Sequence, residues 1–205
     1  MATFPTSPSF QSVNFKVNTP ILRSTSLSGI SRRVAMGNQF YSFTVKFPPL
    51  SPSDQGTVNG FLAARLGGYE AFDIILPEIS YSKAQHPGDH TITVTGALAA
   101  GGNTVTYNVA GSGNHYKNMF AAGDFIRFSN HSKVYQVTTS STSNGSGNGT
   151  IVIGGLLVAS ITTATTIQRD AVPFSVVLAA DENSFEVGFG GYTSISLDLR
   201  EVWGT

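Results

Sequence analysis

Four histidines are the side chains of this sequence best suited to act as bases or to bind a metal. His86 and His90 are four residues apart, a spacing that on a helix would direct two imidazoles at one metal ion. Pro87 and Gly88 lie between them and exclude a helix, and no Glu follows the first histidine as it does in zinc-protease helices. We therefore predict a polar loop here and no metal site.

The other two histidines have hydroxyl or carboxylate residues nearby, and this set of candidate catalytic groups is His115, His131, Asp124, Ser129 and Ser132. A nucleophile and its base also need a third group that orients the base, and an oxyanion site. The sequence supplies no such frame, and it contains no Gly-x-Ser-x-Gly elbow. We predict no catalytic residue among these side chains.

Paired carboxylates could hydrolyse a glycosidic bond, and the candidates are Asp73, Glu78, Asp181, Glu182 and Glu186. Asp181 and Glu182 fall in a predicted turn, which favours a solvated loop. The glycine clusters lack the Lys-Ser or Lys-Thr ending of a phosphate-binding loop and the strand-to-helix context of a dinucleotide fold. The sequence therefore predicts a protein that is not an enzyme and that has no catalytic, cofactor-binding or metal-binding residues and no cofactor.

Aromatic side chains are frequent in the middle of the chain, at Tyr107, Tyr116, Phe120, Phe125, Phe128 and Tyr135. Exposed aromatic rings could stack on sugar rings, because they are amphipathic. A small barrel also needs such residues for its own core, and we interpret most of them as packing residues. A carbohydrate- or receptor-binding module remains the alternative function.

The charges of the chain balance, with 12 Lys and Arg against 12 Asp and Glu among 205 residues. Nucleic-acid binding depends on neutralising several phosphates, so we predict no direct nucleic-acid binding. The balance is uneven along the chain, because five basic residues precede the first acidic residue, Asp54: Lys16, Arg23, Arg32, Arg33 and Lys46. These are either scattered solvated charges or a basic region that meets an acidic patch on a neighbouring copy.

The chain contains no cysteine, so disulfides and thiolate metal sites are excluded, and stability must come from core burial or assembly. No run approaches the ~20 apolar residues of a membrane span, and the N-terminus does not resemble a signal peptide. We expect synthesis and folding in the cytoplasm and no membrane association.

One stretch predicts a helix. Ser51 is a suitable N-cap, Pro52 suits the first helical position, and Asp54 completes a reciprocal cap. Val58, Phe61, Leu62 and either Arg65 or Leu66 fall on one face, and Gly67 with Gly68 would end the helix. We expect this helix to form only when packed, because two internal glycines weaken it.

Strands are predicted on both sides of the helix and at the end of the chain. Residues 40–47 alternate, with Tyr41, Phe43, Val45 and Phe47 on one face, and residues 71–76 form a further strand. Residues 193–202 alternate strictly, directing Ile195, Leu197 and Leu199 inward. Residues 173–180 and 184–187 are predicted to pair with each other through a turn at 181–183.

The middle of the chain has a different sequence pattern, which predicts short strands at residues 91–95, 104–109, 124–128, 133–139, 150–153 and 163–168. Turn-rich gaps separate these strands, which suits a small barrel of the oligonucleotide- or oligosaccharide-binding (OB) type. We predict an all-β protein with one short helix, in which residues 1–84 and 170–205 form a β-sandwich and residues 85–169 form an inserted OB-like barrel. Periodicity alone does not exclude the alternative, in which the chain folds as three consecutive pieces without an insertion.

Several motifs together resemble those of the distal tail (Dit) proteins of long-tailed bacteriophages, in the short two-domain type of siphophages. They are the opening 10–15 (FQSVNF), the aromatic strand with Pro48-Pro-Leu50, the helix with Phe61, Leu62 and Arg65, residues 72–77 (FDIILP), residues 122–135 (AGDFIRFSNHSKVY) and residues 194–201 (SISLDLRE). The resemblance runs almost end to end. None of these motifs contains a catalytic residue.

This resemblance implies a structural protein of the virion, a baseplate hub component assembled in the host cytoplasm. It further implies a homo-oligomer, a hexameric ring, that joins the tail tube protein to the tail tip proteins. Larger members carry additional carbohydrate modules, for which this chain has no room. We also expect the N-terminal segment 1–19 to become ordered against neighbouring rings.

Overall fold

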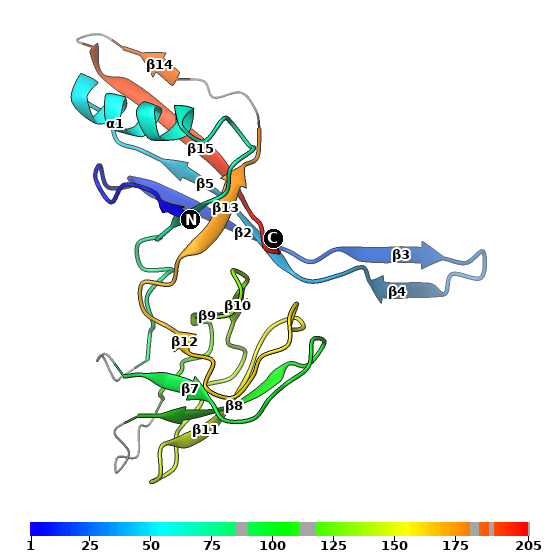
Figure 1. Ribbon diagram of the computed structural model, residues 1–205. Helices are drawn as coiled ribbons and strands as arrows, with labels where there is room; N and C mark the ends of the chain where they lie inside the picture. Colours follow the sequence, from blue (N-terminus) through cyan, green and yellow to red (C-terminus); the bar gives the residue numbers. More distant parts are fainter. Residues whose placement is uncertain (85–89, 111–117, 181–184, 189–190, 205) are drawn as a thin grey trace.

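A computed structural model describes residues 1–84, 90–110, 118–180, 185–188 and 191–204. Within these ranges the regular structure is β apart from one helix, α1 (Pro52–Ala63), which confirms the predicted fold class. Figure 1 shows a large curled sheet that carries the helix, a second group of strands below it, and a hairpin that projects sideways.

The large sheet combines both ends of the chain. Its strands are β1 (Ala2–Thr3), β2 (Ser12–Asn18), β5 (Phe40–Lys46), β6 (Phe72–Ile74), β13 (Phe174–Leu178), β14 (Phe185–Val187) and β15 (Thr193–Glu201). The order is β1-β6-β13-β15-β5-β2, with β14 also paired to β15. β1 and β2 both belong to this sheet, so part of segment 1–19 has regular structure within its own chain. Its ordering against neighbouring rings stays a prediction.

The sheet curls strongly enough to enclose its own core. The rings of Phe15 in β2 and Phe174 in β13 have centroids 5.8 Å apart, although β15 and β5 lie between these strands. A flat sheet would hold the two strands about 14 Å apart, at about 4.8 Å for each step. The sandwich is thus formed by two facing halves of one continuous sheet.

Alternation in the central strands fills this core as predicted. Tyr41, Phe43 and Val45 of β5 are buried, and so are Ile195 and Leu197 of β15. Polar residues alternate with them on the other face, which is the pattern of a strand with one buried face.

The pairing of the last strands differs from the prediction. β13 and β14 do not pair with each other. Instead, both pair with β15, β13 at residues 199–201 and β14 at residues 193–195. At nine residues, β15 is long enough to pair with the two shorter strands one after the other along its length.

The helix begins as predicted and ends earlier. The Ser51 side chain accepts a hydrogen bond from the Asp54 amide at 3.3 Å and donates one to the Asp54 carboxylate at 2.7 Å. The helix buries Val58 and Leu62 and ends at Ala63, with Ala64 as its C-cap. Leu66 has a φ of 51° and is 68% exposed, so it belongs to the turn and not to the buried face.

The second group of strands closes into a barrel. All six strands predicted in the middle segment are present: β7 (Ile92–Val94), β8 (Thr104–Val109), β9 (Phe125–Phe128), β10 (Val134–Gln136), β11 (Asn148–Val152) and β12 (Ile167–Gln168). They form two sheets, β10-β9-β12 and β11-β8-β7, and the bridges Thr93–Thr166 and Val137–Ile153 join these sheets on both sides. The OB-type assignment and the domain boundaries at residues 85 and 169 remain predictions.

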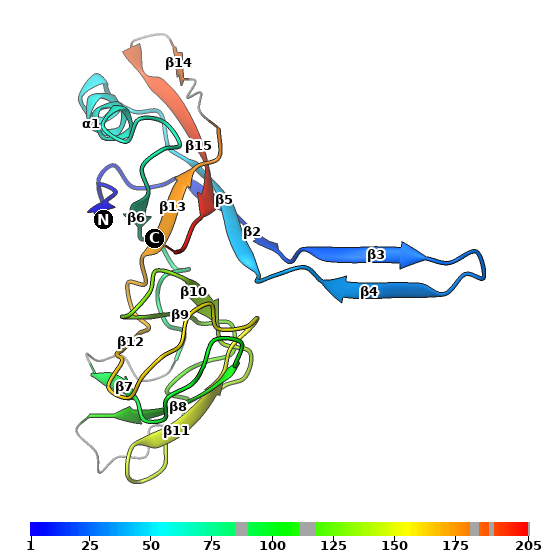
Figure 2. The same cartoon turned by 45° about the vertical axis from the view of Figure 1, so that its right-hand side comes forward.

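A hairpin stands apart from both bodies. Strands β3 (Ile21–Thr25) and β4 (Ser31–Ala35) form a separate two-stranded sheet between β2 and β5, and Figure 2 shows it projecting far from the rest of the molecule. These two strands were not among those predicted from the sequence.

Candidate functional site

The projecting hairpin, residues 20–36, is exposed at every residue from Ile21 to Met36, and we refer to it as the arm. Its base is closed by a hydrogen bond from the Met36 amide to the Pro20 carbonyl at 2.9 Å. Five antiparallel pairs run from Ile21–Ala35 to Thr25–Ser31, and every residue in both strands is exposed. The arm therefore gains no support from a core of its own.

The arm ends in a tight turn that presents an apolar tip. The Ser26 carbonyl accepts from the Gly29 amide at 2.9 Å, and Gly29 adopts a φ of 80°, which glycine tolerates best. The Ser26 hydroxyl accepts from the Ile30 amide at 3.2 Å and fixes the turn further. Leu27 is fully exposed at the tip, and Ile30 is 63% exposed beside it.

The charges of the arm are all positive. Arg23 lies directly opposite Arg33, and Arg32 lies opposite Ser24. Like charges that face each other across two strands are destabilising. No acidic residue occurs in the arm to offset them, because the first one in the sequence is Asp54. The arrangement would be relieved by a partner that supplies negative charge.

These features make the arm a candidate interaction surface. An isolated two-stranded hairpin is at best marginally stable in water. The arm also exposes Leu22 opposite Val34, at 55% and 58%, and burying each such side chain would contribute about 1.5 to 3 kcal/mol. A binding partner that covers the arm would supply the missing support.

A buried ion pair joins the barrel to the large sheet where the arm begins. Lys133 precedes β10 of the barrel and lies 2.6 Å from Glu201 at the end of β15, with side chains 3% and 0% exposed. Glu201 also accepts from the amides of Tyr41 at 3.1 Å and Val134 at 3.0 Å. The carboxylate thus binds one charged group and two backbone donors.

Burial controls the electrostatics of this junction. Loss of water lowers the pKa of Lys133 and raises the pKa of Glu201, while the attraction between them opposes both shifts. The Lys133 ammonium also lies 4.5 Å from the ring centroid of Tyr41 and 4.6 Å from that of Trp203, distances that permit cation–π attraction. The pair is enclosed by aromatic rings and backbone groups, which suits a structural role.

Apolar contacts cross the same junction. Phe125 of β9 and Val134 of β10 belong to the core of the large sheet, although both strands are part of the barrel. The ring of Phe125 lies 5.3 Å from that of Tyr41 and 5.5 Å from that of Phe174. The barrel and the sheet therefore share part of one core.

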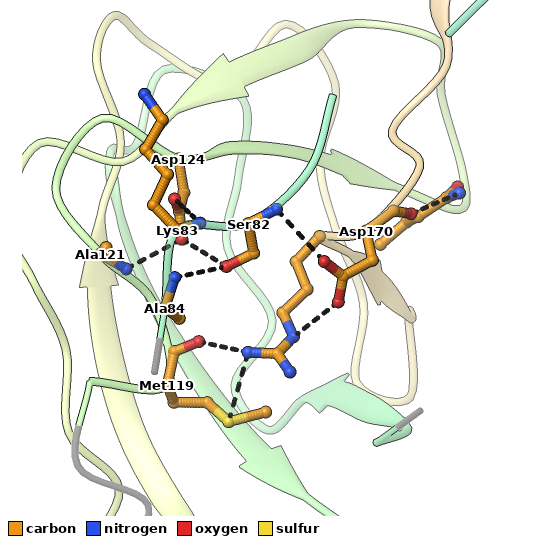
Figure 3. A network of polar contacts seen from close by, with 9 residues as sticks. Ser82, Lys83, Ala84, Met119, Ala121, Asp124 and Asp170 are labelled. Atoms are coloured by element: carbon orange, nitrogen blue, oxygen red, sulfur yellow. Dashed lines mark hydrogen bonds and ion pairs between the residues drawn. The ribbon is translucent and has the colours of Figure 1, made fainter. Parts of the chain in front are cut away.

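A second polar network lies where the chain passes from the large sheet into the barrel and where it returns, as Figure 3 shows. Asp124 is buried and accepts from the Ser82 hydroxyl at 2.7 Å, the Lys83 amide at 2.8 Å and the Ala121 amide at 2.9 Å. Asp170 accepts from the Ser82 amide at 3.2 Å. The outgoing chain near Ser82 and the returning chain at Asp170 are thus bound to each other and to the barrel.

Comparison with known proteins finds a relative that matches nearly the whole chain. The chain is 27% identical over 201 residues to the distal tail protein pb9 of Escherichia phage T5, and the match covers 94% of this chain and 91% of that protein. This similarity supports the role of a structural distal tail component for the chain. No family model matches it.

The match identifies a structural component of the phage tail and confirms the virion location predicted from the sequence motifs. As part of a phage tail, the protein associates with other tail components. Within the residues that the structure describes, no helix has the length and apolar character needed to cross a lipid bilayer.

The ring hydrogen bonds of His131 go to residues other than the suggested catalytic partners. The two ring nitrogens of His131 lie 2.8 Å from the Asn130 amide oxygen and 2.9 Å from the Tyr135 hydroxyl, and burial lowers its pKa to about 4. The Asp124 carboxylate accepts hydrogen bonds from Ser82, Lys83 and Ala121 instead. His86 and His115 lie outside the described residues.

The carboxylate candidates are dispersed among different settings. Asp73 binds Arg127 at 3.1 Å and the Ser175 hydroxyl at 2.6 Å, whereas Glu78 and Glu186 are exposed. Asp181 and Glu182 lie outside the described residues. Within the described part of the chain, no group of three His, Asp or Glu side chains is placed to hold a metal ion.

The aromatic candidates for sugar stacking are mostly core residues, as interpreted from the sequence. Five of the six are buried: Tyr107, Phe120, Phe125, Phe128 and Tyr135. Tyr116 lies outside the described residues. The five buried rings offer no exposed face on which a sugar could stack.

Proposed function

We propose that this distal tail protein forms a closed ring of identical copies, a hexamer, that joins the tail tube to the tail tip and has no catalytic role. The exposed arm is the observation that carries the proposal. It combines unsupported strands, apolar side chains and unopposed arginines, which together require a partner surface.

Copies of the same chain are the simplest partner for such an arm. An arm that binds a different surface on its neighbour makes a heterologous contact, and heterologous contacts close into a ring when the rotation allows it. The buried ion pair and the shared core at the junction support this role, because a ring needs subunits whose barrel and sheet keep a fixed relative position.

Mass measurement tests the proposal. We would measure the mass of the purified protein by light scattering, alone and mixed with the tail tube and tail tip proteins of the same phage, and image the assemblies by electron microscopy. The expected result is a hexameric ring. A chain that stays monomeric in every mixture would refute the proposal.

A matched pair of variants locates the contact. Leu22→Ser with Val34→Ser removes one exposed apolar pair from the arm, and Thr106→Ser with Thr150→Ser changes a directly opposed exposed pair on the barrel. The arm variant should lose at least 3 kcal/mol of apolar burial at the contact and assemble more than 100-fold more weakly. The barrel variant should assemble as the natural protein does.

A further inference from the structure

An apolar hollow of about 260 Å³ lies beside the N-terminal segment of the large sheet. Most of the residues around it are aromatic or aliphatic, and they include Phe4, Phe10, Ile75, Pro77 and Tyr81. Phe4 is buried and its ring lies 6.0 Å from that of Phe10, so the floor of the hollow is fixed by the core. Tyr81 is 48% exposed at its edge.

The hollow matches the tip of the arm in size and chemistry. A dry cavity of about 150 Å³ can hold a benzene molecule, so 260 Å³ can accept aliphatic side chains such as Leu27 and Ile30. These two tip residues are among the exposed large apolar side chains of the chain.

The arm and the hollow lie on opposite sides of the molecule. In Figures 1 and 2 the N-terminal segment lies on one side of the large sheet, while β3 and β4 extend away from the other side. The arm therefore cannot reach the hollow of its own chain. A contact between them has to join two copies, and it is heterologous, as ring closure requires.

The charges at the two surfaces are complementary. Glu78 directly follows Pro77 of the hollow and is exposed, and its backbone has a φ of 61°. Arg32 lies two residues from Ile30, next to the tip. Docking of the tip would bring a cationic strand toward this acidic rim, and opposite charges at a rim favour encounter and fix orientation.

We infer that the hollow receives the arm tip of a second copy, with Leu27 and Ile30 inserted among Phe4, Phe10 and Tyr81 and with Arg32 facing Glu78. This inference rests on the proposed ring and names the surface that each arm binds.

Disulfide trapping tests the docking directly, because the natural chain has no cysteine. Leu27→Cys combined with Tyr81→Cys should give covalently linked copies under mild oxidation. Leu27→Cys with Thr150→Cys is the control, because Thr150 is exposed on the barrel. Links that form only with Tyr81→Cys support the inference, and a ring that forms without links, or with equal links in the control, overturns it. If no ring forms, the proposed function fails as well.

A charge exchange provides an independent test. Arg32→Glu or Glu78→Arg alone should weaken assembly at least several-fold, and the double variant should restore it. Assembly that is unaffected by either single variant, or that is lost additively in the double variant, would contradict the pairing of Arg32 with Glu78 while leaving the ring itself intact.

Discussion

Replacing Lys133 by Met should destabilise the protein by about 3 kcal/mol at pH 8. Breaking a buried ion pair by removing one partner costs about 3 to 5 kcal/mol, because the remaining charge is left buried and uncompensated. The lower end applies here, because Glu201 keeps two backbone hydrogen bonds, from Tyr41 and Val134. The measurement is urea unfolding followed by circular dichroism and by the emission of Trp203, the single tryptophan of the chain, which lies at the junction.

The pH dependence of this loss has a definite sign. Without Lys133 the pKa of Glu201 rises further, because burial already raises it and the opposing attraction is gone. A group whose pKa is raised by folding stabilises the folded state below its unfolded pKa, and this contribution is lost as the pH rises. Lys133→Met should therefore cost more at pH 8 than at pH 5.

Two controls make the result interpretable. Adding Glu201→Gln to Lys133→Met removes the unpaired charge and should recover much of the lost stability, because the amide oxygen can still accept a backbone hydrogen bond. Glu70→Gln breaks the partly exposed pair with Arg65, 2.8 Å apart, and should cost less than about 1 kcal/mol. A Lys133→Met variant as stable as the natural protein at pH 8, or a double variant that loses the sum of both single effects, would refute the reasoning.

Three further predictions concern other parts of the fold. Phe61→Ala should cost about 3 kcal/mol in urea unfolding, the lower end for such truncations, because the ring is half-buried against the core; an unchanged midpoint would show that the helix is held elsewhere. His131→Gln should flatten the fall in melting temperature between pH 6.5 and pH 4. Folding lowers the pKa of this imidazole to about 4, so over this range the unfolded chain takes up a proton that the folded chain does not, and stability is lost as the pH falls. Parallel pH curves for the variant and the natural protein would contradict this. Gly147→Ala should destabilise the barrel, because the residue has a φ of 79° and an added Cβ would meet the Val109 carbonyl at 2.8 Å, whereas Gly145→Ala faces open space and should have little effect on the melting temperature.

The central strands were predictable because each has one buried and one exposed face. In β5 and β15, alternation directs Phe43 and Leu197 into the core, and that pattern is visible in any window of the sequence. The cap of the helix was equally local, since Ser51 and Asp54 lie three residues apart.

The arm could not be found in the same way, because no residue of β3 or β4 faces a core. Without a buried face, the usual alternation of apolar and polar residues is absent. A signal was nevertheless present, since two short runs rich in β-branched and arginine residues flank a Ser-Leu-Ser-Gly turn at residues 26–29. The opposition of Arg23 and Arg33 becomes apparent only once the register is known.

The junction was hidden from the sequence for a different reason. Lys133 and Glu201 are 68 residues apart, and nothing near either residue indicates the other. Asp124 was considered as a partner for a catalytic histidine, because local sequence shows its type and not its burial. Its three hydrogen bonds instead come from Ser82, Lys83 and Ala121.

The base of the arm has a mechanical consequence. Asn38 accepts from the Leu156 amide of the barrel at 3.2 Å, and Tyr41, three residues later, donates its amide to Glu201 of the large sheet. A load that tilts the arm is therefore borne first by a short stretch attached to both bodies. A force that a neighbouring subunit exerts on the arm would therefore act on the barrel and the large sheet together, through residues 38–41.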